Sequence, residues 1–388
     1  MTIEILKKEL EERYSASGSQ IQFYFSPGRV NLIGEHTDYN GGYVFPCALS
    51  FGTYLAVRQI DEPLIRMSTT NFDFQAEIPI GSSYEKIGDE WVNYPLGVVS
   101  ELTKRGVKIP GLEMLFSGNI PNKSGLSSSA SIELVTAVAL NELLGLGISR
   151  IDLVKIGRAA ENHFVGVNCG IMDQFAVGMG KKDHAIYLNC DTLDYELVPI
   201  KLEGYKLVIA NTNKPRGLAD SKYNERVAEC QTAVKMLSDG KKITLLAQLN
   251  MNDFNSLQHH ITDEVIKRRA RHVISENDRT FEAVAVLKTG DLLRFGQLMN
   301  DSHDSLRDDY EVTGIELDTL VAESRKIPGV IGSRMTGAGF GGCTVSLVKE
   351  ESIDRMIREV GESYLSITNL KAEFYVAEIG NGAQKIMC

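Results

Sequence analysis

Residues 28–43 read GRVNLIGEHTDYNGGY. The apolar, β-prone residues within 30–33 predict a strand, and Gly41-Gly42 predicts a turn before the apolar residues 43–45. Between these two segments, which favour burial, lie the polar and charged residues 35–38, EHTD. This cluster is either a hairpin tip exposed to water or a pocket for a ligand that carries many hydroxyl groups. The other motifs of the chain are needed to choose between the two.

The composition is that of a globular protein long enough for two domains. The chain has 388 residues, 43% hydrophobic and 24% charged, and its net charge of −10 argues against nucleic acid or an anionic membrane as a partner. No segment has the roughly 20 mostly apolar residues of a membrane span. The first 14 residues predict a charged amphipathic helix, not a signal peptide. Six scattered cysteines without a CxxC pair predict a reduced, cytoplasmic protein.

Strand-like and helix-like segments alternate along the chain without internal repeats, so both α-helices and β-strands are expected in the fold. We predict strands at 21–26, 43–60, 63–70, 111–118, 184–190, 206–210, 329–335, 343–349 and 372–377, and helices at 92–105, 127–144, 151–165, 221–237, 244–248, 262–286, 290–305, 315–325 and 352–366. A domain boundary is expected near residue 200, which gives an N-terminal domain of residues 1–200 and a C-terminal domain of residues 201–388.

A glycine- and serine-rich stretch, PNKSGLSSSA at residues 121–130, joins a predicted strand to a predicted helix. Serine is favoured where a helix begins, and the free N–H groups and the dipole of a helix N-terminus form an anion site. The hydroxyls of Ser127, Ser128 and Ser129 add donors, or an oxygen ligand for a hard cation such as Mg²⁺. The alternative is a serine-rich loop in which one serine caps the helix.

A second glycine-rich stretch, MTGAGFGGC at residues 335–343, contains the spacing GxGxxG. A dinucleotide-binding turn requires a helix after the glycines, whereas residues 344–348 predict a strand. No GxxxxGK[ST] phosphate loop occurs anywhere in the chain. The stretch therefore predicts a tight loop that lets a backbone approach closely either a ligand or another backbone.

Two acids in residues 160–175, AENHFVGVNCGIMDQF, are candidates for a joint role. On one unbroken helix Glu161 and Asp173 would lie roughly 18 Å apart. Gly166 and Gly170 are helix breakers, so a broken helix could fold Asp173 back toward Glu161. Asp173 also stands among apolar residues, and a carboxylate in such surroundings requires either a partner or a shifted pKa.

These motifs together resemble the galactokinase family of the GHMP (galactose, homoserine, mevalonate, phosphomevalonate) kinases. GRVNLIGEHTDYNGG is similar to the galactokinase signature, PNKSGLSSSA to the nucleotide loop of the family, and MTGAGFGGC to its third motif. AENHFVGVNCGIMDQF and SKYNERVAEC also fit galactokinases in particular. The resemblance extends over nearly the whole chain.

The resemblance implies an activity and a fold. The expected reaction is transfer of the γ-phosphoryl group of ATP, with Mg²⁺, to the C1 hydroxyl of α-D-galactose, giving α-D-galactose 1-phosphate and ADP, the first committed step of the Leloir pathway. The expected fold is the two-domain GHMP kinase fold, with an N-terminal domain like ribosomal S5 domain 2, a ferredoxin-like C-terminal domain and the active site between them. Galactose and ATP would be the partners of a cytoplasmic monomer, with no nucleic acid and no membrane.

The resemblance also implies roles for single residues. Asp173 resembles the catalytic base that takes the proton of the C1 hydroxyl, and Arg29 resembles the cation beside it. Ser129 and Glu161 resemble Mg²⁺ ligands. The implied sugar contacts are Glu35, His36, Thr37, Asp38, Gly170 and Tyr223. The implied nucleotide contacts are Ser68, Trp91, Lys123, Ser124, Gly125, Leu126, Ser127, Ser128 and Ser129.

The chain departs from the family pattern at two positions. Lys123 replaces the first glycine of PxGxGLSSSA, which affects the local geometry of the nucleotide loop. Val227 replaces a second arginine in SKYNERVAEC, a change expected to affect only surface or packing. Two other functions remain open from the sequence: a catalytically silent galactose sensor, and the same chemistry on N-acetylgalactosamine.

Overall fold

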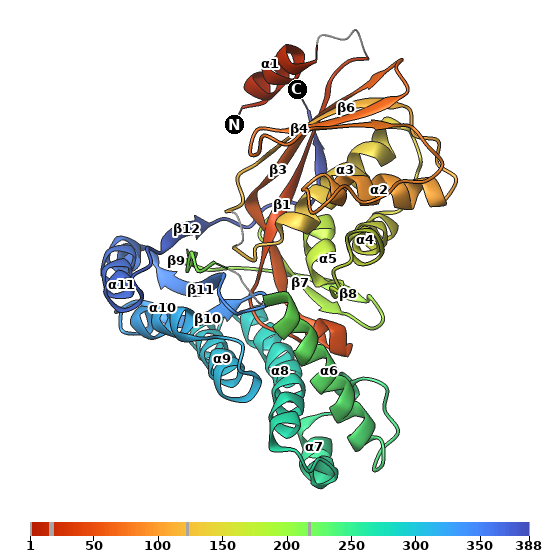
Figure 1. Cartoon of the computed structure of the whole chain (residues 1–388). Coiled ribbons are helices and arrows are strands. Elements are labelled where there is room, and N and C mark those ends of the chain that lie inside the picture. Colours follow the sequence, from red (N-terminus) through yellow and green to blue (C-terminus); the bar gives the residue numbers. More distant parts are fainter. Residues whose placement is uncertain (1, 15–18, 122–123, 216–218, 388) are drawn as a thin grey trace.

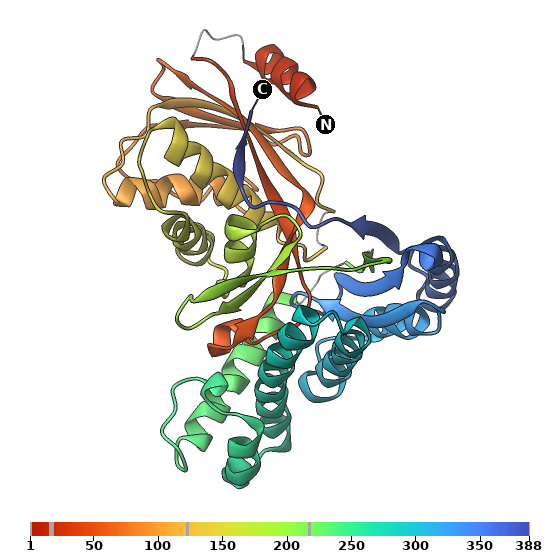
Figure 2. The same cartoon turned by 180° about the vertical axis from the view of Figure 1, so that it is seen from behind.

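The computed structural model describes residues 2–14, 19–121, 124–215 and 219–387, and the chain forms two lobes that meet along its middle (Figures 1 and 2). The first lobe is built on a six-stranded sheet in the order β13-β1-β3-β6-β4-β5. These strands are β1 (Gln22–Asn31), β3 (Pro46–Ile60), β4 (Leu64–Thr69), β5 (Ala76–Pro79), β6 (Gly111–Gly118) and β13 (Gln384–Ile386). Because β13 pairs with β1, the last described strand returns to the first lobe.

Helices cover both faces of this sheet because each face buries apolar side chains. One face carries α2 (Asn93–Lys104), α3 (Ser128–Leu143), α4 (Arg150–Ala159) and α5 (Met172–Met179), which surround the largest hydrophobic core (Figure 1). On the other face α1 (Ile3–Arg13) buries Leu6 and Leu10 against Phe23, Ala56 and Leu115. A smaller sheet of β2 (Tyr43–Val44), β7 (His184–Asn189) and β8 (Tyr195–Pro199) lies at the base of the lobe.

The second lobe has a four-stranded antiparallel sheet in the order β10-β11-β9-β12. Its strands are β9 (Tyr205–Asn211), β10 (Val330–Thr336), β11 (Cys343–Lys349) and β12 (Glu373–Ala377), with α11 (Ile353–Thr368) between the last two. A βαββαβ connection with this strand order is the ferredoxin-like arrangement, so that prediction is confirmed.

Of the helices inserted between β9 and β10, the first three extend away from both sheets, whereas the last two pack against the sheet of the second lobe (Figure 1). They are α6 (Ala219–Leu237), α7 (Met251–Leu257), α8 (Glu264–Lys288), α9 (Leu292–Ser305) and α10 (Ile315–Arg325). Short helical turns elsewhere in the chain and in this segment are labelled η1 to η6, at Asp38–Asn40, Ala160–Val165, Leu246–Gln248, Gln258–His260, Leu306–Tyr310 and Glu350–Ser352. The long helix α8 reaches back to the first lobe, where its side chains support the EHTD segment.

The α+β class implied by the resemblance is confirmed, and most predicted elements of the described residues occur with ends shifted by a few residues, but 244–248 holds only the three-residue turn Leu246–Gln248. The strands β5, β8 and β13 and the helices α5 and α7 were not predicted. None of the helices in the described ranges is long and apolar enough to cross a membrane. The thiols of Cys47, Cys169, Cys190 and Cys230 form no disulfide.

Candidate active site

The glycine-serine loop leads into α3 through an unusual backbone. Ser127 precedes the helix with a φ of 62°, and its side chain makes no capping hydrogen bond, although serine was expected to cap. Gly125 has a φ of 76°. The hydroxyls of Ser124 and Ser127 are buried and have no hydrogen-bond partner within the described ranges. This loop therefore presents unused donors at the positive end of a 16-residue helix, a combination suited to phosphate groups.

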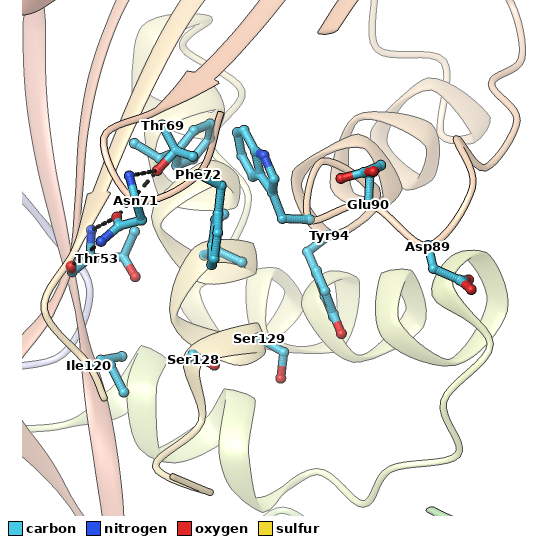
Figure 3. Close-up of a pocket in the computed structure, with 14 residues that line it drawn as sticks. Thr53, Thr69, Asn71, Phe72, Asp89, Glu90, Tyr94, Ile120, Ser128 and Ser129 are labelled. Atoms are coloured by element: carbon cyan, nitrogen blue, oxygen red, sulfur yellow. Dashed lines mark hydrogen bonds between the residues drawn. The ribbon is translucent and has the colours of Figure 1, made fainter. Parts of the chain in front are cut away.

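A cavity of about 550 Å³ opens beside this helix end. Figure 3 shows Thr69 and Asn71 on one side, Tyr94 of α2 on the other, and Ser128 and Ser129 at the start of α3. Trp91 lies in the wall, with its Nε1 donating to the carbonyl oxygen of Phe74 at 3.1 Å. The lining is completed by Thr53, Phe72, Asp89, Glu90, Phe116, Gly118, Ile120 and Ile132. Because the lining combines aromatic side chains with hydroxyl groups, the cavity suits a ligand with a flat ring and a phosphate tail.

A second cavity, of about 320 Å³, lies on the other side of the same helix end. Tyr94, Ser128 and Ser129 line both cavities, so a ligand in each would meet at the start of α3. The remaining lining residues are Arg29, Glu35, His36, Asp38, Glu161, Val167, Asn168, Cys169, Gly170, Met172, Asp173, Tyr223, Gly337 and Ala338. All three sequence motifs thus contribute to this second cavity.

Asp173 and Arg29 form the charged pair at its centre. Asp173 Oδ1 accepts from Arg29 Nε at 2.9 Å and Nη2 at 2.8 Å, and Arg29 Nη1 donates to the carbonyl oxygen of Gly125 at 2.6 Å. Arg29 is 3% exposed, whereas the side chain of Asp173 is 29% exposed. A register shift of β1 between Pro27 and Arg29 precedes the arginine. Arg29 is thus the charged partner that a carboxylate among apolar residues requires, and the Asp173 carboxylate still lines the cavity.

The helix that carries Glu161 is broken as predicted. The π-helical turn η2 ends at Gly166, which adopts a φ of 92°, and α5 begins at Met172. The break brings Asp173 back to the cavity that Glu161 also lines. Burial, and then the nearby Asp173, raise the pKa of Glu161 to about 7.

One carboxylate oxygen of Glu161 accepts hydrogen bonds from uncharged side chains. Its Oε2 accepts from Gln174 Nε2 at 2.5 Å and lies 3.6 Å from Cys169 Sγ. The same Gln174 Nε2 donates to Glu133 Oε2 at 3.1 Å. Glu133 is fully buried in α3, and this burial raises the pKa of its carboxyl well above the ordinary range. The sequence motifs gave no separate signal for Glu133 or Gln174, although Gln174 directly follows Asp173.

The EHTD segment is buried, which excludes the exposed hairpin tip. Glu35 is 1% exposed, and its Oε1 accepts from the N–H of Gly337 at 2.8 Å and pairs with Arg334 at 3.3 Å. From α8, Glu276 Oε1 accepts the N–H groups of Gly34 at 2.9 Å and Glu35 at 3.3 Å. Motifs 300 residues apart are therefore joined through a buried network, which sequence analysis did not foresee.

The polar side chains next to Glu35 face the cavity. Burial lowers the pKa of His36 to about 3, so its ring is neutral, and its Nδ1 lies 2.9 Å from the Tyr39 hydroxyl. Burial and the nearby Asp173 raise the pKa of Asp38 to about 6. Tyr223 of α6 lies with its ring centroid 5.9 Å from that of His36. Gly170 allows this packing, since a Cβ at this position would lie 1.7 Å from Asp38 Oδ2.

The third motif, residues 335–343, was expected to approach closely either a ligand or another backbone, and its glycines contact both another backbone and the second cavity. It forms the turn between β10 and β11, and a Cβ at Gly339 would lie 2.3 Å from the carbonyl oxygen of Val312, so this glycine admits another backbone. Gly337 and Ala338 instead line the second cavity. His36, Ser127 and Phe340, one in each motif, have φ angles of 62°, 62° and 56°. Such costly conformations in non-glycine residues concentrate at functional sites.

Not every expected site residue reaches a cavity. Thr37 is buried and its hydroxyl donates to the carbonyl oxygens of Gly34 and Tyr43, so it supports the turn. Ser68 is buried beside Tyr14 at the opposite face of the sheet, because side chains alternate along β4 and Thr69 faces the cavity instead. The Leu126 side chain belongs to a hydrophobic core. Lys123 lies outside the described residues.

Three family models match the chain. The galactokinase galactose-binding signature matches residues 8–59, the GHMP kinases N terminal domain matches residues 93–181, and the GHMP kinases C terminal model matches residues 283–366. The matched ranges contain the residues of the first lobe that line the second cavity, and they also include part of the second lobe.

Relatives of known identity align over the full length. The galactokinase of Fusobacterium nucleatum is 54% identical over 389 residues, with 99% of this chain and 100% of the relative covered, and that of Clostridium beijerinckii is 53% identical over 391 residues, with 99% of each covered. The crystal structure of Lactococcus lactis galactokinase complexed with galactose superposes with a TM-score of 0.97 at 44% identity, with 100% of both chains covered. Mevalonate kinase of Methanococcus jannaschii, at 19% identity and a TM-score of 0.65 over 95% of this chain and all of its own, shares the fold.

Proposed function

The chain belongs to the galactokinase family of the GHMP kinases, and from this premise we propose how the residues around its two cavities perform the reaction. It transfers the γ-phosphoryl group of ATP to the C1 hydroxyl of α-D-galactose, giving α-D-galactose 1-phosphate and ADP. The observation that carries the assignment of residues is the meeting of the two cavities at the start of α3. Phosphoryl transfer needs the donor and acceptor in line at one point, and Ser128 and Ser129 lie at this point.

We assign the larger cavity to ATP. Its adenine ring would lie by Trp91, and its phosphates would run toward the N-terminus of α3. There the hydroxyls of Ser124 and Ser127, which have no partner within the described ranges, would donate to phosphate oxygens. Lys123 stays a predicted nucleotide contact.

We assign the smaller cavity to galactose. Glu35, His36, Asp38 and Tyr223 present a carboxylate pair, a neutral imidazole and a phenol, which together accept from and donate to sugar hydroxyls. Because Glu35 is already bound by Gly337 and Arg334, its orientation is set before the sugar arrives. Preorganised partners cost little on binding and distinguish one pattern of hydroxyls from another.

Asp173 takes the proton of the C1 hydroxyl in this assignment. It is the partly exposed member of the pair with Arg29, so one carboxylate oxygen is left for the substrate while Oδ1 is held by the guanidinium. General-base catalysis of this kind typically contributes about 10²–10⁴-fold to the rate. Arg29 stays fixed on the carbonyl oxygen of Gly125 and places positive charge between the base and the nucleotide loop.

A divalent cation, which we propose to be Mg²⁺, fits the acids at this junction. Burial and, after it, the nearby Asp173 raise the pKa of Glu161, and a cation would favour the ionised carboxylate. Ser129 adds a hydroxyl within hydrogen-bonding reach of the Glu161 carboxylate. The remaining ligands of Mg²⁺ would come from substrate phosphates and water. The ion supplies charge neutralisation of the phosphates.

We also propose that the protein is a reduced, cytoplasmic monomer with no nucleic acid or membrane partner. We further propose that the chain divides near residue 200 into an N-terminal galactose- and ATP-binding domain and a C-terminal domain. The net charge of −10 and the thiols of Cys47, Cys169, Cys190 and Cys230, which form no disulfide, support the first of these assignments. The change from one sheet to the other between β8 and β9 supports the second.

A coupled ADP-release assay with a sugar panel tests the proposal. We expect ADP release with galactose and Mg·ATP, and loss of this activity in Asp173→Asn with galactose binding retained. A silent sensor would bind galactose and release no ADP. Preference for N-acetylgalactosamine over galactose would contradict the assigned acceptor.

A further inference from the structure

One buried amide joins two acids behind the reaction centre. Gln174 is 0% exposed, and its Nε2 donates to Glu161 Oε2 at 2.5 Å and to Glu133 Oε2 at 3.1 Å. The three side chains come from α5, η2 and α3, so the amide ties together three helical segments. We propose that Gln174, anchored by Glu133, is a positioning residue that fixes the Glu161 carboxylate for the metal ion. The inference rests on the proposed function, in which Glu161 is a metal ligand.

The uncharged nature of this donor is essential to the role. Gln174 and Cys169 both lie against Oε2 of Glu161, so the other oxygen is left for the cavity that Glu161 lines. A lysine or arginine in the place of Gln174 would neutralise Glu161 and compete with the cation. A carboxylate would add a third acid and no donor. An amide orients the ligand and keeps its charge, as hydrogen-bonding partners behind metal ligands commonly do.

Glu133 prevents the amide from turning away. Within the described ranges, the acceptors of Gln174 Nε2 are the two glutamates and Cys169 Sγ at 3.9 Å. A terminal amide rotates over a broad range unless it is held. The surroundings are also closed: a Cβ at Gly157 of α4 would lie 3.4 Å from Gln174 Cγ and 3.7 Å from Glu133 Cβ. The amide therefore has one well-defined orientation, and it is the one that holds Glu161.

Direct metal binding tests the proposal without relying on turnover. Mn²⁺ is titrated by electron paramagnetic resonance into the full-length protein with saturating ADP, and unfolding of the metal-free protein is recorded in parallel. We expect Gln174→Met, which keeps the length and removes the donor, to weaken Mn²⁺ binding by about 10- to 100-fold. The KM for galactose should change by less than threefold, since Gln174 does not line the sugar cavity.

Matched variants separate positioning from packing. Thr136→Val removes another buried hydrogen bond of α3, from its hydroxyl to the carbonyl oxygen of Ile132, and should lower stability without changing Mn²⁺ affinity. Glu133→Leu should weaken Mn²⁺ binding in the same direction as Gln174→Met, and Glu133→Gln, which keeps an oxygen for Nε2, should recover most of that loss.

The outcomes are distinct. Wild-type Mn²⁺ affinity in Gln174→Met, with Glu161→Gln impaired, overturns the positioning role and leaves the metal role of Glu161 standing. Unchanged affinity in Glu161→Gln overturns the metal role itself. If Gln174→Met does not fold, Gln174→Asn decides by the same titration, because its shorter side chain draws the amide back from Glu161.

Discussion

Replacing Gly170 with alanine is expected to impair galactose binding by displacing a single carboxylate. A Cβ at this position would lie 1.7 Å from Asp38 Oδ2 and 2.4 Å from Asp38 Cγ, whereas ordinary contact begins at 3.4 Å. The carboxylate must therefore move by about 1.7 Å, the difference between 3.4 and 1.7 Å. Gly170 has no positive φ, so alanine adds no backbone strain there and the effect is steric.

The size of the effect follows from the loss of hydrogen bonds between the sugar and a charged acceptor. A shift of this size takes a hydrogen bond well beyond its normal range, and a bond to a charged group contributes about 1.5–3 kcal/mol. Since about 1.4 kcal/mol corresponds to a factor of ten, we expect galactose to bind roughly 10- to 150-fold more weakly. Binding of an ATP analogue should be unchanged, because neither Gly170 nor Asp38 lines the nucleotide cavity.

Isothermal titration calorimetry with galactose measures this loss, and a double-mutant cycle with Asp38→Ala assigns it. If Gly170 acts through Asp38, the double variant binds galactose as weakly as Asp38→Ala alone. Additive losses would refute the reasoning, and so would wild-type affinity in Gly170→Ala. Gly361→Ala on α11, where the added Cβ would make ordinary contact at 3.4 Å with Phe374, is the control for a generic effect of alanine.

Three further predictions concern the chemistry. Asp173→Asn should keep galactose affinity and lose about 10²–10⁴-fold in kcat, and near wild-type turnover would refute its role as the base. Glu161→Gln should raise the Mg²⁺ concentration needed for half-maximal activity more than the KM for galactose; the reverse pattern would contradict a metal role. Because the pKa of Asp38 is raised to about 6, the carboxylate is lost as pH falls through 6, so galactose affinity measured between pH 5 and 8 should decline on the acidic side. This decline should vanish in Asp38→Asn, and a flat profile in the wild type would exclude Asp38 as an anionic acceptor.

Local patterns were sufficient to predict much of the site. Glycine and serine composition predicted the loop before α3, and the breakers around residues 166–170 predicted that Asp173 folds back toward Glu161. These predictions depend on backbone preferences that act within a few residues. The face on which a side chain lies was harder to predict. Ser68 points away from the larger cavity and Thr69 lines it, because the register of β4 against its neighbours sets the alternation.

The sequence by itself determined most of the strands and helices, the positions of the three motifs and the kinds of side chain available for chemistry. Only the tertiary structure decided which of these side chains meet. The pairing of β13 with β1, the contact of Arg334 with Glu35 and the amide of Gln174 between Glu133 and Glu161 all join segments far apart in the chain. Such contacts are set by the packing of whole sheets and helices, since burial requires every charge and polar group to find its partner wherever the fold places one.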